Sequence, residues 1–327
     1  MKVGIDTFTI RELGLDPFQT LDFLQTHGFD GALFGGMRGL SDTLDPGRLR
    51  EIRQQADSMG LYTDVSVPGC NPHLIAPDEL DAHRAEIERQ IAAAAETGWH
   101  ELHSSLGGGD ERYHHPVPWT QHLADSAEFI RGLGPVLRAH GSRINLETHG
   151  DTTTFELVRL IEDVGPDIVG ICLDTANVLC HAEDPVLAAK RAAPYTHLTH
   201  TKDAIMFFCD KGYTRQGRAP GQGILDWPQI LRALAEYSPG LRLSIEDHKW
   251  LFTFAVFQED WLALHPDLTC AEFGKVISLV WQCETRIRSG DLPDPQEYEA
   301  IPYLDQMLER LYSGRDYLRG VLAEWVP

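Results

Sequence analysis

The chain has 327 residues and a formal net charge of −21, because 49 acidic residues outnumber 28 Lys and Arg residues. This length suits one large core with an added segment, and the acidity argues against a nucleic-acid partner, whose phosphates the protein would repel. No apolar run approaches the roughly 18 residues of a membrane helix, and the N-terminus turns polar too early for a signal peptide, so we expect a soluble, cytoplasmic protein without membrane contact.

Short β-rich apolar runs alternate with helical patterns along the first 250 residues. This alternation is typical of a parallel sheet covered by helices. Eight such units predict a closed (β/α)8 barrel, the TIM barrel of the α/β class, rather than an open sheet. Helical patterns cover residues 82–96 and 124–139, among others. The predicted strands centre on residues 3–5, 32–34, 62–65, 101–104, 144–147, 169–174, 196–200 and 241–246.

Two segments depart from this regular spacing. Residues 204–223 are rich in Gly, are long for a barrel connection and follow the seventh predicted strand, so we interpret them as a lid over the site. Residues 251–327 begin with aromatic clusters and continue with helical patterns over 270–288 and 303–324. We therefore expect a barrel catalytic domain at residues 1–250 and a C-terminal extension at residues 251–327 that is helical and forms interfaces.

Charged side chains stand where four consecutive predicted strands end. In a barrel of this type the carboxyl ends of the strands converge on one face, so these side chains are expected to meet there. About one strand–helix unit separates each from the next, apart from the interval that holds the predicted lid. We call them the ligand quartet: Glu147, Asp174, His200 and Glu246.

Three carboxylates in one crevice raise one another's pKa values unless a cation lies among them. Any single strand-end carboxylate could instead cap a helix or pair with a surface lysine, but four residues in register favour a shared metal. Three oxygen donors and one imidazole suit Mn²⁺ best, with Mg²⁺, Co²⁺ and Zn²⁺ as alternatives. The sequence therefore predicts one divalent metal at the mouth of the barrel.

At these residues the chain resembles the sugar phosphate isomerase/epimerase family, the xylose isomerase-like barrels. The resemblance implies that the ligand quartet binds a divalent metal and that Glu147 and Glu246 also move protons. Ketose 3-epimerases of that family place a His three residues after the ligand Asp, whereas this chain has Asn177, which weakens the case for simple epimerisation. The motifs that carry the resemblance lie at residues 146–147, 173–177, 200–203, 221–227 and 244–246.

A narrower resemblance extends past the barrel. Residues 246–248, the aromatic stretch that follows and residues 259–269 resemble the large (alpha) subunit of bacterial C-glycoside deglycosidases. Those enzymes split 3-oxo-glucosides of phenolic aglycones with the same barrel and metal, and they contain a small β-type subunit. The resemblance therefore implies a hetero-oligomer with a small second chain.

Two reactions fit the predicted site, and both begin with loss of a proton from the carbon beside a ketone, which a metal favours by stabilising the resulting charge. A lyase acting on a 3-oxo-glycoside removes the C2 proton and expels the aglycone from C1. An isomerase or epimerase of a free ketose instead returns the proton through an enediolate and needs two proton-transfer groups. A catalytically silent binding subunit is a third alternative, against which the intact ligand quartet argues.

Further side chains near the predicted strand ends are candidates for catalysis or substrate binding. His149, two residues after Glu147, is the candidate base, although a solvated loop His is the alternative. His103, Asn177 and Lys202 are expected to contact the substrate, with packing alone as the alternative for His103. Asp203 is expected to orient His200 or Lys202, as carboxylates beside metal-bound imidazoles do.

Three other patterns suggest sites that we reject. His100, His103, His114 and His115 lack the regular spacing of zinc ligands. The glycine turn at residues 107–109 lacks the Lys-Ser/Thr of a phosphate-binding loop. The aromatic residues between 252 and 261 are more typical of a core or a subunit contact than of a ligand cage. The six cysteines form no C-x-x-C pair and are expected to be reduced.

Overall fold

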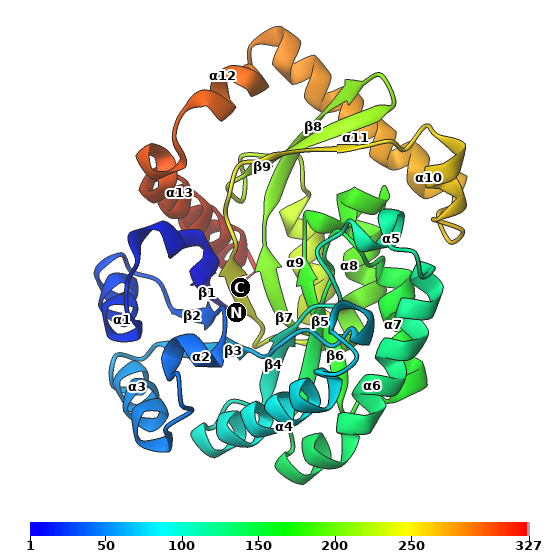
Figure 1. The fold of residues 1–327 in the computed structure, drawn as a ribbon. Coiled ribbons are helices and arrows are strands. Elements are labelled where there is room, and N and C mark those ends of the chain that lie inside the picture. Colours follow the sequence, from blue (N-terminus) through cyan, green and yellow to red (C-terminus); the bar gives the residue numbers. More distant parts are fainter. Residues whose placement is uncertain (326–327) are drawn as a thin grey trace.

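The computed structural model describes residues 1–325, so the last two residues of the expected 251–327 extension lie outside the described residues. Eight parallel strands close into a barrel in the order β1-β10-β7-β6-β5-β4-β3-β2, as predicted (Figure 1). The barrel strands are β1 (Lys2–Asp6), β2 (Gly31–Phe34), β3 (Tyr62–Ser66), β4 (Glu101–Ser104), β5 (Arg143–Glu147), β6 (Val169–Asp174), β7 (Thr196–Thr201) and β10 (Arg242–Ile245).

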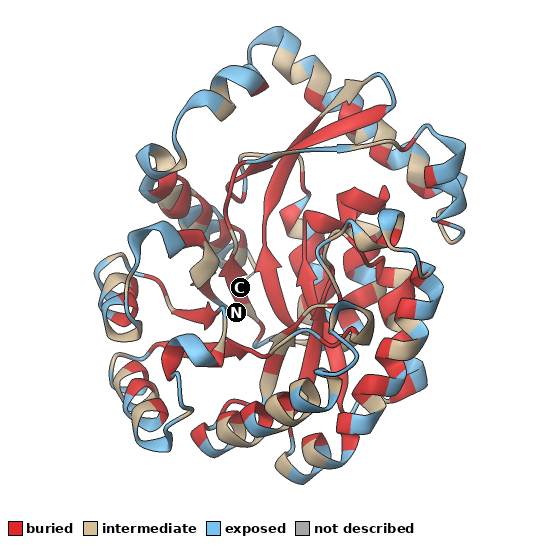
Figure 2. Cartoon of the chain, in the orientation of Figure 1, coloured by how far each residue is buried: buried red, intermediate tan, exposed pale blue. Residues whose placement is uncertain are grey.

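Helices surround the barrel, with their outward faces exposed and the strands buried inside them (Figure 2). Seven of them follow β1 to β7, and α13 completes the ring by packing against β1, β10 and α9. No helix within residues 1–325 is long and apolar enough to cross a bilayer. The outer helices are α1 (Pro17–Thr26), α3 (Pro46–Ser58), α4 (Leu80–Thr97), α6 (Trp119–His140), α7 (Thr154–Val164), α8 (Pro185–Ala192), α9 (Trp227–Tyr237) and α13 (Tyr303–Ala323).

Local sequence signals set where these helices begin and end. Asp16, Asp184 and Asp226 each accept a backbone hydrogen bond at the start of a helix that has proline in its first turn. Thr153 and Glu156 form a capping box at the start of α7. The long helix α11 (Cys270–Ser289) lies outside the ring of outer helices, and the shorter helical elements are η1 (Thr7–Leu13), α2 (Met37–Leu40), η2 (Pro72–Leu74), α5 (Glu111–His114), η3 (Asn177–His181), η4 (Ala193–Tyr195), α10 (Glu259–Ala263) and α12 (Pro295–Ala300).

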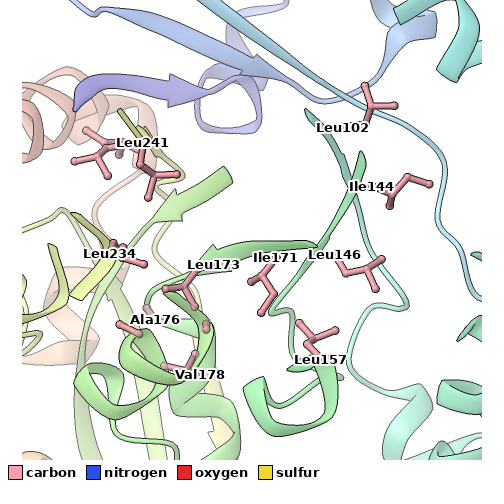
Figure 3. Packing of buried hydrophobic residues seen from close by; sticks show 14 of the residues in the cluster. Leu102, Ile144, Leu146, Leu157, Ile171, Leu173, Ala176, Val178, Leu234 and Leu241 are labelled. Carbon is pink, nitrogen blue, oxygen red and sulfur yellow. The ribbon is translucent and has the colours of Figure 1, made fainter. Parts of the chain in front are cut away.

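The alternation of side chains along β5 and β6 builds the core and the site together. Ile171 and Leu173 of β6 belong to the large core cluster that also contains Leu157 of α7, and Figure 3 shows these side chains beside one another. Successive residues of a strand point to opposite faces, so Cys172 and Asp174 point into the barrel instead. Since Asp174 is the last residue of β6, its carboxylate lies at the barrel mouth.

A second sheet stands over one side of that mouth. Its strands are β8 (Asp203–Cys209), β9 (Gly212–Arg218) and β11 (Leu251–Phe254), in the order β11-β9-β8. The sequence predicts a covering lid over residues 204–223, whereas the structure has an antiparallel hairpin there, with α11 packed against β8. The hairpin is a paired wall rather than a structureless loop because its backbone groups bond to one another and to β11.

The expected division of the chain at residue 250 stays a prediction, but contacts cross it. β11, after residue 250, pairs with β9, before it, and α13 packs on the barrel strands β1 and β10.

All six cysteines are free thiols, which agrees with the expectation that they are reduced.

The close packing of the barrel strands around Gly4 of β1 can be tested by a substitution at that glycine. A Cβ at Gly4 would collide with the carbonyl oxygen of Gly31 and the hydroxyl of Tyr62. We expect Gly4→Ala to lower the free energy of unfolding by about 1–3 kcal/mol, because an overfilled core forces its neighbours to move. Urea denaturation measures the change. Gly240→Ala is the control, since a Cβ there meets no atom within 4 Å, and equal stability of both variants would contradict the packing described.

Candidate active site

The structure brings the predicted ligand quartet together at the carboxyl ends of four adjacent strands. One ligand atom from each of its members lies within 4.8 Å of the others. Glu147 and Asp174 end β5 and β6, His200 lies in β7, and Glu246 directly follows β10. The strand register places Asp174 beside His200, and His200 beside Ser244. The assignment of these residues as metal ligands stays a prediction that this geometry supports.

The donor atoms of the quartet fit a divalent cation. His200 Nδ1 lies 3.2 Å from Glu147 Oε1 and 3.2 Å from Glu246 Oε2. Within residues 1–325, both ring nitrogens of His200 are buried and make no hydrogen bond, and Asp174 Oδ2 and Glu246 Oε2 are paired with the Lys202 ammonium. Buried polar atoms are normally paired, so the His200 nitrogens and the crowded carboxylates suit coordination of a cation. Three carboxylates and one imidazole form a mostly oxygen donor set.

Neighbouring positive charge keeps two of the carboxylates ionised. Burial favours their neutral forms, but His200 and His149 around Glu147, and Lys202 and His200 around Glu246, hold both pKa values well below the usual range. The Lys202 ammonium lies 2.8 Å from Asp174 Oδ2 and 2.9 Å from Glu246 Oε2. Burial raises the pKa of Asp174 despite this contact. The site therefore concentrates negative charge that His200 and Lys202 offset in part.

The candidate substrate-binding residues lie around the quartet. His103 Nε2 contacts Glu147 Oε2 at 3.1 Å, and Asn177 Nδ2 donates to Glu147 Oε1 at 3.5 Å. His149 lines the cavity above the quartet and has a buried Nδ1 without a hydrogen-bond partner. Lys202 touches two quartet carboxylates, as described above. All four candidates therefore border the space where a substrate would bind.

Asp203 does not have the expected position. Its carboxylate accepts hydrogen bonds from the backbone of Ala204, Gly221 and Leu225 at 2.8, 2.9 and 3.2 Å, and from Trp227 Nε1 at 2.8 Å. The side chain thus points toward the segment that leads into α9, where several donors stabilise its buried charge, and not toward His200 or Lys202. Asp203 anchors the base of the β8–β9 hairpin.

Sequence reasoning missed several residues of the site. Asp6 ends β1, and its Oδ2 lies 3.4 Å from His200 Nε2, so the strand-end argument applied to the first strand would have found it. Ser66, at the end of β3, bonds His103 Nδ1 at 2.8 Å. Arg215 of β9 donates to Asn177 Oδ1 at 2.7 Å; it lies in the segment that the sequence predicts to cover the site, but no motif singles out this residue.

The C-terminal helix holds the segment that carries Glu246. The next residue, Asp247, accepts hydrogen bonds from Arg310 of α13 at Oδ1 and Oδ2, 2.5 and 2.7 Å long. Both side chains are almost fully buried. The Asp247 amide also donates to Thr9 Oγ1 at 2.9 Å. The position of Glu246 therefore depends on residues from both ends of the chain.

A cavity of about 1150 Å³ opens above the quartet. Its floor contains the quartet members Glu147, His200 and Glu246. Its walls come from the ends of the barrel strands, the β4–α5 segment, the β8–β9–β11 sheet and α10, including aromatic side chains. Of the rejected zinc cluster, only His103 belongs to a potential metal-binding group within residues 1–325, together with Cys172 and His200. The cavity aromatic residues are Phe8, Tyr113, Trp250, Phe252, Phe254 and Trp261.

Comparison with known proteins adds a family and several relatives. The family model of the xylose isomerase-like TIM barrel matches residues 21–257. The uncharacterized protein YihM of Escherichia coli is 29% identical over 94 residues, which cover 29% of this chain and 29% of that protein. D-psicose 3-epimerase of Agrobacterium fabrum is 25% identical over 203 residues, covering 58% of this chain and 65% of the enzyme. The chain thus matches less than two thirds of the length of either relative.

Solved structures share the fold over most of the chain. D-psicose 3-epimerase of Clostridium cellulolyticum with D-tagatose has a TM-score of 0.68, 16% identity, and coverage of 98% of this chain and 99% of that one. The 3-keto-D-glucoside 4-epimerase of Escherichia coli has a TM-score of 0.59, 17% identity, and coverage of 82% and 100%. A zinc-bound IolI protein has a TM-score of 0.58, 17% identity, and coverage of 86% and 99%.

Metal titration tests the quartet directly. We expect chelator-treated protein to bind one Mn²⁺ per chain, and Asp174→Asn to weaken that binding by at least about tenfold, since even outer residues of metal sites contribute this much. Isothermal titration calorimetry measures both. Glu101→Gln is the matched control, because Glu101 begins β4 at the opposite end of the barrel. Unchanged affinity in Asp174→Asn would exclude the site.

The protonation of His200 predicts how the affinity for Mn²⁺ depends on pH. Burial disfavours its charged form, but the carboxylates of Glu147 and Glu246 outweigh that effect and raise the pKa of His200 above its usual value. A metal that binds His200 therefore competes with a proton for the ring nitrogen. We expect Mn²⁺ affinity to rise with pH between 6 and 8, by up to about tenfold per unit, with proton release in buffers of different ionisation enthalpy. Affinity independent of pH would contradict this.

Proposed function

Because the chain belongs to the xylose isomerase-like TIM barrel family, we propose that it is a divalent-metal-dependent lyase that cleaves 3-oxo-glycosides. The observation that carries this proposal is the size and lining of the cavity. It measures about 1150 Å³ and joins the ligand quartet to an aromatic wall. Cavities that enclose drug-sized ligands measure about 300–1,000 Å³. The space therefore suits a sugar joined to a ring system better than a free monosaccharide.

The quartet residues would hold the metal, with Mn²⁺ as the proposed ion. Once bound, the metal supplies Lewis-acid stabilisation for the charge that develops on the ketone oxygen. His149, beside the quartet and in its neutral form, takes the proton from C2. The electron pair of that C–H bond forms the C1=C2 double bond, the bond from C1 to the aglycone breaks, and its electron pair leaves with the aglycone. Lys202, paired with two carboxylates, keeps them charged and in position.

A small β-type subunit completes the enzyme in this proposal. The support is the resemblance of residues 246–248 and 259–269 to the large subunit of C-glycoside deglycosidases. Residues 259–263 form α10, and Trp261 of α10 lines the cavity. The segment that carries the resemblance is therefore part of the cavity wall, where a second chain could complete the enclosure.

An isomerase or epimerase of a ketose is the second candidate. Its support is the presence of two ionised carboxylates, Glu147 and Glu246, each 3.2 Å from His200 Nδ1, because such a reaction removes and returns a proton with two groups. The relative from Agrobacterium fabrum is a D-psicose 3-epimerase, and the related structure from Escherichia coli is a 3-keto-D-glucoside 4-epimerase. Asn177, at the position where ketose 3-epimerases have His, favours the lyase.

Release of an aglycone distinguishes the two reactions. We expect manganese-loaded protein, with a candidate small subunit, to release free aglycone from a 3-oxo C-glucoside of a flavonoid, followed by chromatography. Chelator should abolish the release, Glu147→Gln should reduce it at least about a hundredfold, and His149→Ala should reduce it by the 10²–10⁴-fold typical of a lost base. His140→Ala, at the exposed end of α6, is the matched control.

Two outcomes would overturn the proposed reaction. No release with or without the second chain, together with chelator-sensitive interconversion of free ketoses, would establish the isomerase or epimerase instead. Release that persists in chelator and in Glu147→Gln would exclude the metal-dependent elimination.

A further inference from the structure

Arg215 is a buried cation whose hydrogen-bonding capacity is only partly used. It lies on β9, is 2% exposed and lines the cavity. Its Nη1 donates to the carbonyl oxygen of Ala176 at 3.0 Å and to Asn177 Oδ1 at 2.7 Å, while its buried Nε has no hydrogen-bond partner. No salt bridge within residues 1–325 includes Arg215. A buried charge without a counter-charge is costly, so a ligand is expected to supply one.

Aromatic side chains form the rest of the wall beside this cation. Arg215 pairs across the sheet with Phe252, and its guanidinium carbon lies 5.2 Å from the centre of the Phe252 ring. The Phe252 and Trp250 ring centres are 6.1 Å apart, and those of Trp250 and His248 are 4.4 Å apart. His248 Nδ1 is also buried without a partner. We call these four cavity-lining residues the sheet wall: Arg215, His248, Trp250 and Phe252.

The sheet wall adjoins the reacting end of the cavity. Asn177 connects the two parts, because its amide oxygen accepts from Arg215 and its amide nitrogen donates to Glu147 Oε1 at 3.5 Å. Arg215 is thus one side chain away from a member of the ligand quartet. The sheet wall and the quartet therefore border the same part of the cavity, within reach of one substrate.

We propose that the sheet wall is the subsite for the leaving group and selects an aromatic ring that carries an acidic oxygen, a carboxylate or an ionised phenol. The planar guanidinium matches such an oxygen group in geometry and charge, and the aromatic side chains match the ring. That the bound ring is the leaving group of the reaction rests on the proposed function. That the subsite binds an anionic aromatic ring rests on Arg215 and its surroundings alone.

This assignment gives Arg215 a place in the elimination. The C2 proton moves to the base, its bonding pair forms the C1=C2 double bond, and the pair of the broken C1–aglycone bond stays on the aglycone. The aglycone then takes a proton from water. Arg215 offsets the negative charge during this step, because a buried ionic donor stabilises developing charge.

Binding of small aromatic probes tests the subsite without any turnover. Isothermal titration calorimetry would compare benzoate with the neutral benzamide, using chelator-treated protein so that a metal cannot bind the carboxylate. We expect benzoate to bind wild-type protein at least about tenfold more tightly, because hydrogen bonds to a charged acceptor are stronger than neutral ones. Equal affinity for the two probes would overturn the inference.

Three variants test which residue causes the preference for benzoate over benzamide. Arg215→Gln should remove it, while Arg218→Gln should keep it, because Arg218 lies on the same strand but packs on the Tyr298 ring outside the cavity. Phe252→Ala should lower the affinity for benzoate and for benzamide by similar factors. Circular dichroism checks folding, and the wild-type comparison still decides if Arg215→Gln does not fold. A preference that survives in folded Arg215→Gln and disappears in Lys211→Gln would assign the anion to the exposed cavity lysine instead.

The two proposals can fail separately. A benzoate preference in a protein that releases no aglycone would leave the subsite standing and remove the lyase. Aglycone release without any benzoate preference would support the lyase and remove the subsite.

Discussion

The repulsion among three carboxylates at the mouth of the barrel is the constraint on which the site depends. Parallel strands bring Glu147, Asp174 and Glu246 together within a few ångströms, and the burial of Glu147 and Asp174 removes much of the water that would otherwise screen them. His200 and Lys202 offset part of that charge. Their contacts leave several donor atoms without hydrogen bonds, and a divalent cation among those atoms would complete the balance.

The parts added to the barrel serve this same mouth. The β8–β9–β11 sheet stands beside it, and Asp203 fixes the base of the β8–β9 hairpin through four hydrogen bonds. The segment after Glu246 continues into β11, so one stretch of chain carries a quartet residue and then the aromatic wall. Arg310 of α13 holds Asp247 and thereby fixes the point where that stretch leaves the barrel. The cavity is therefore shaped by residues far apart in the sequence.

The family assignment and the local chemistry answer different questions about function. Family membership establishes the xylose isomerase-like barrel, but a barrel hosts many reactions, and its chemistry depends on its site. The local features on which the proposed elimination rests are the aromatic sheet wall, Arg215 and Asn177 beside Glu147.

The sequence by itself determined the closed barrel and the convergence of the quartet, because strand periodicity and strand ends are local signals that the barrel places on one face. It also identified His103, His149, Asn177 and Lys202 as neighbours of that face. Only the tertiary structure decided that residues 204–223 form a paired hairpin, that Asp203 points away from His200, and that Arg215 and Arg310 reach the site. The reason is physical: these positions depend on pairing between β9 and β11 and on the docking of α13, contacts between distant segments that leave no periodic mark in the sequence.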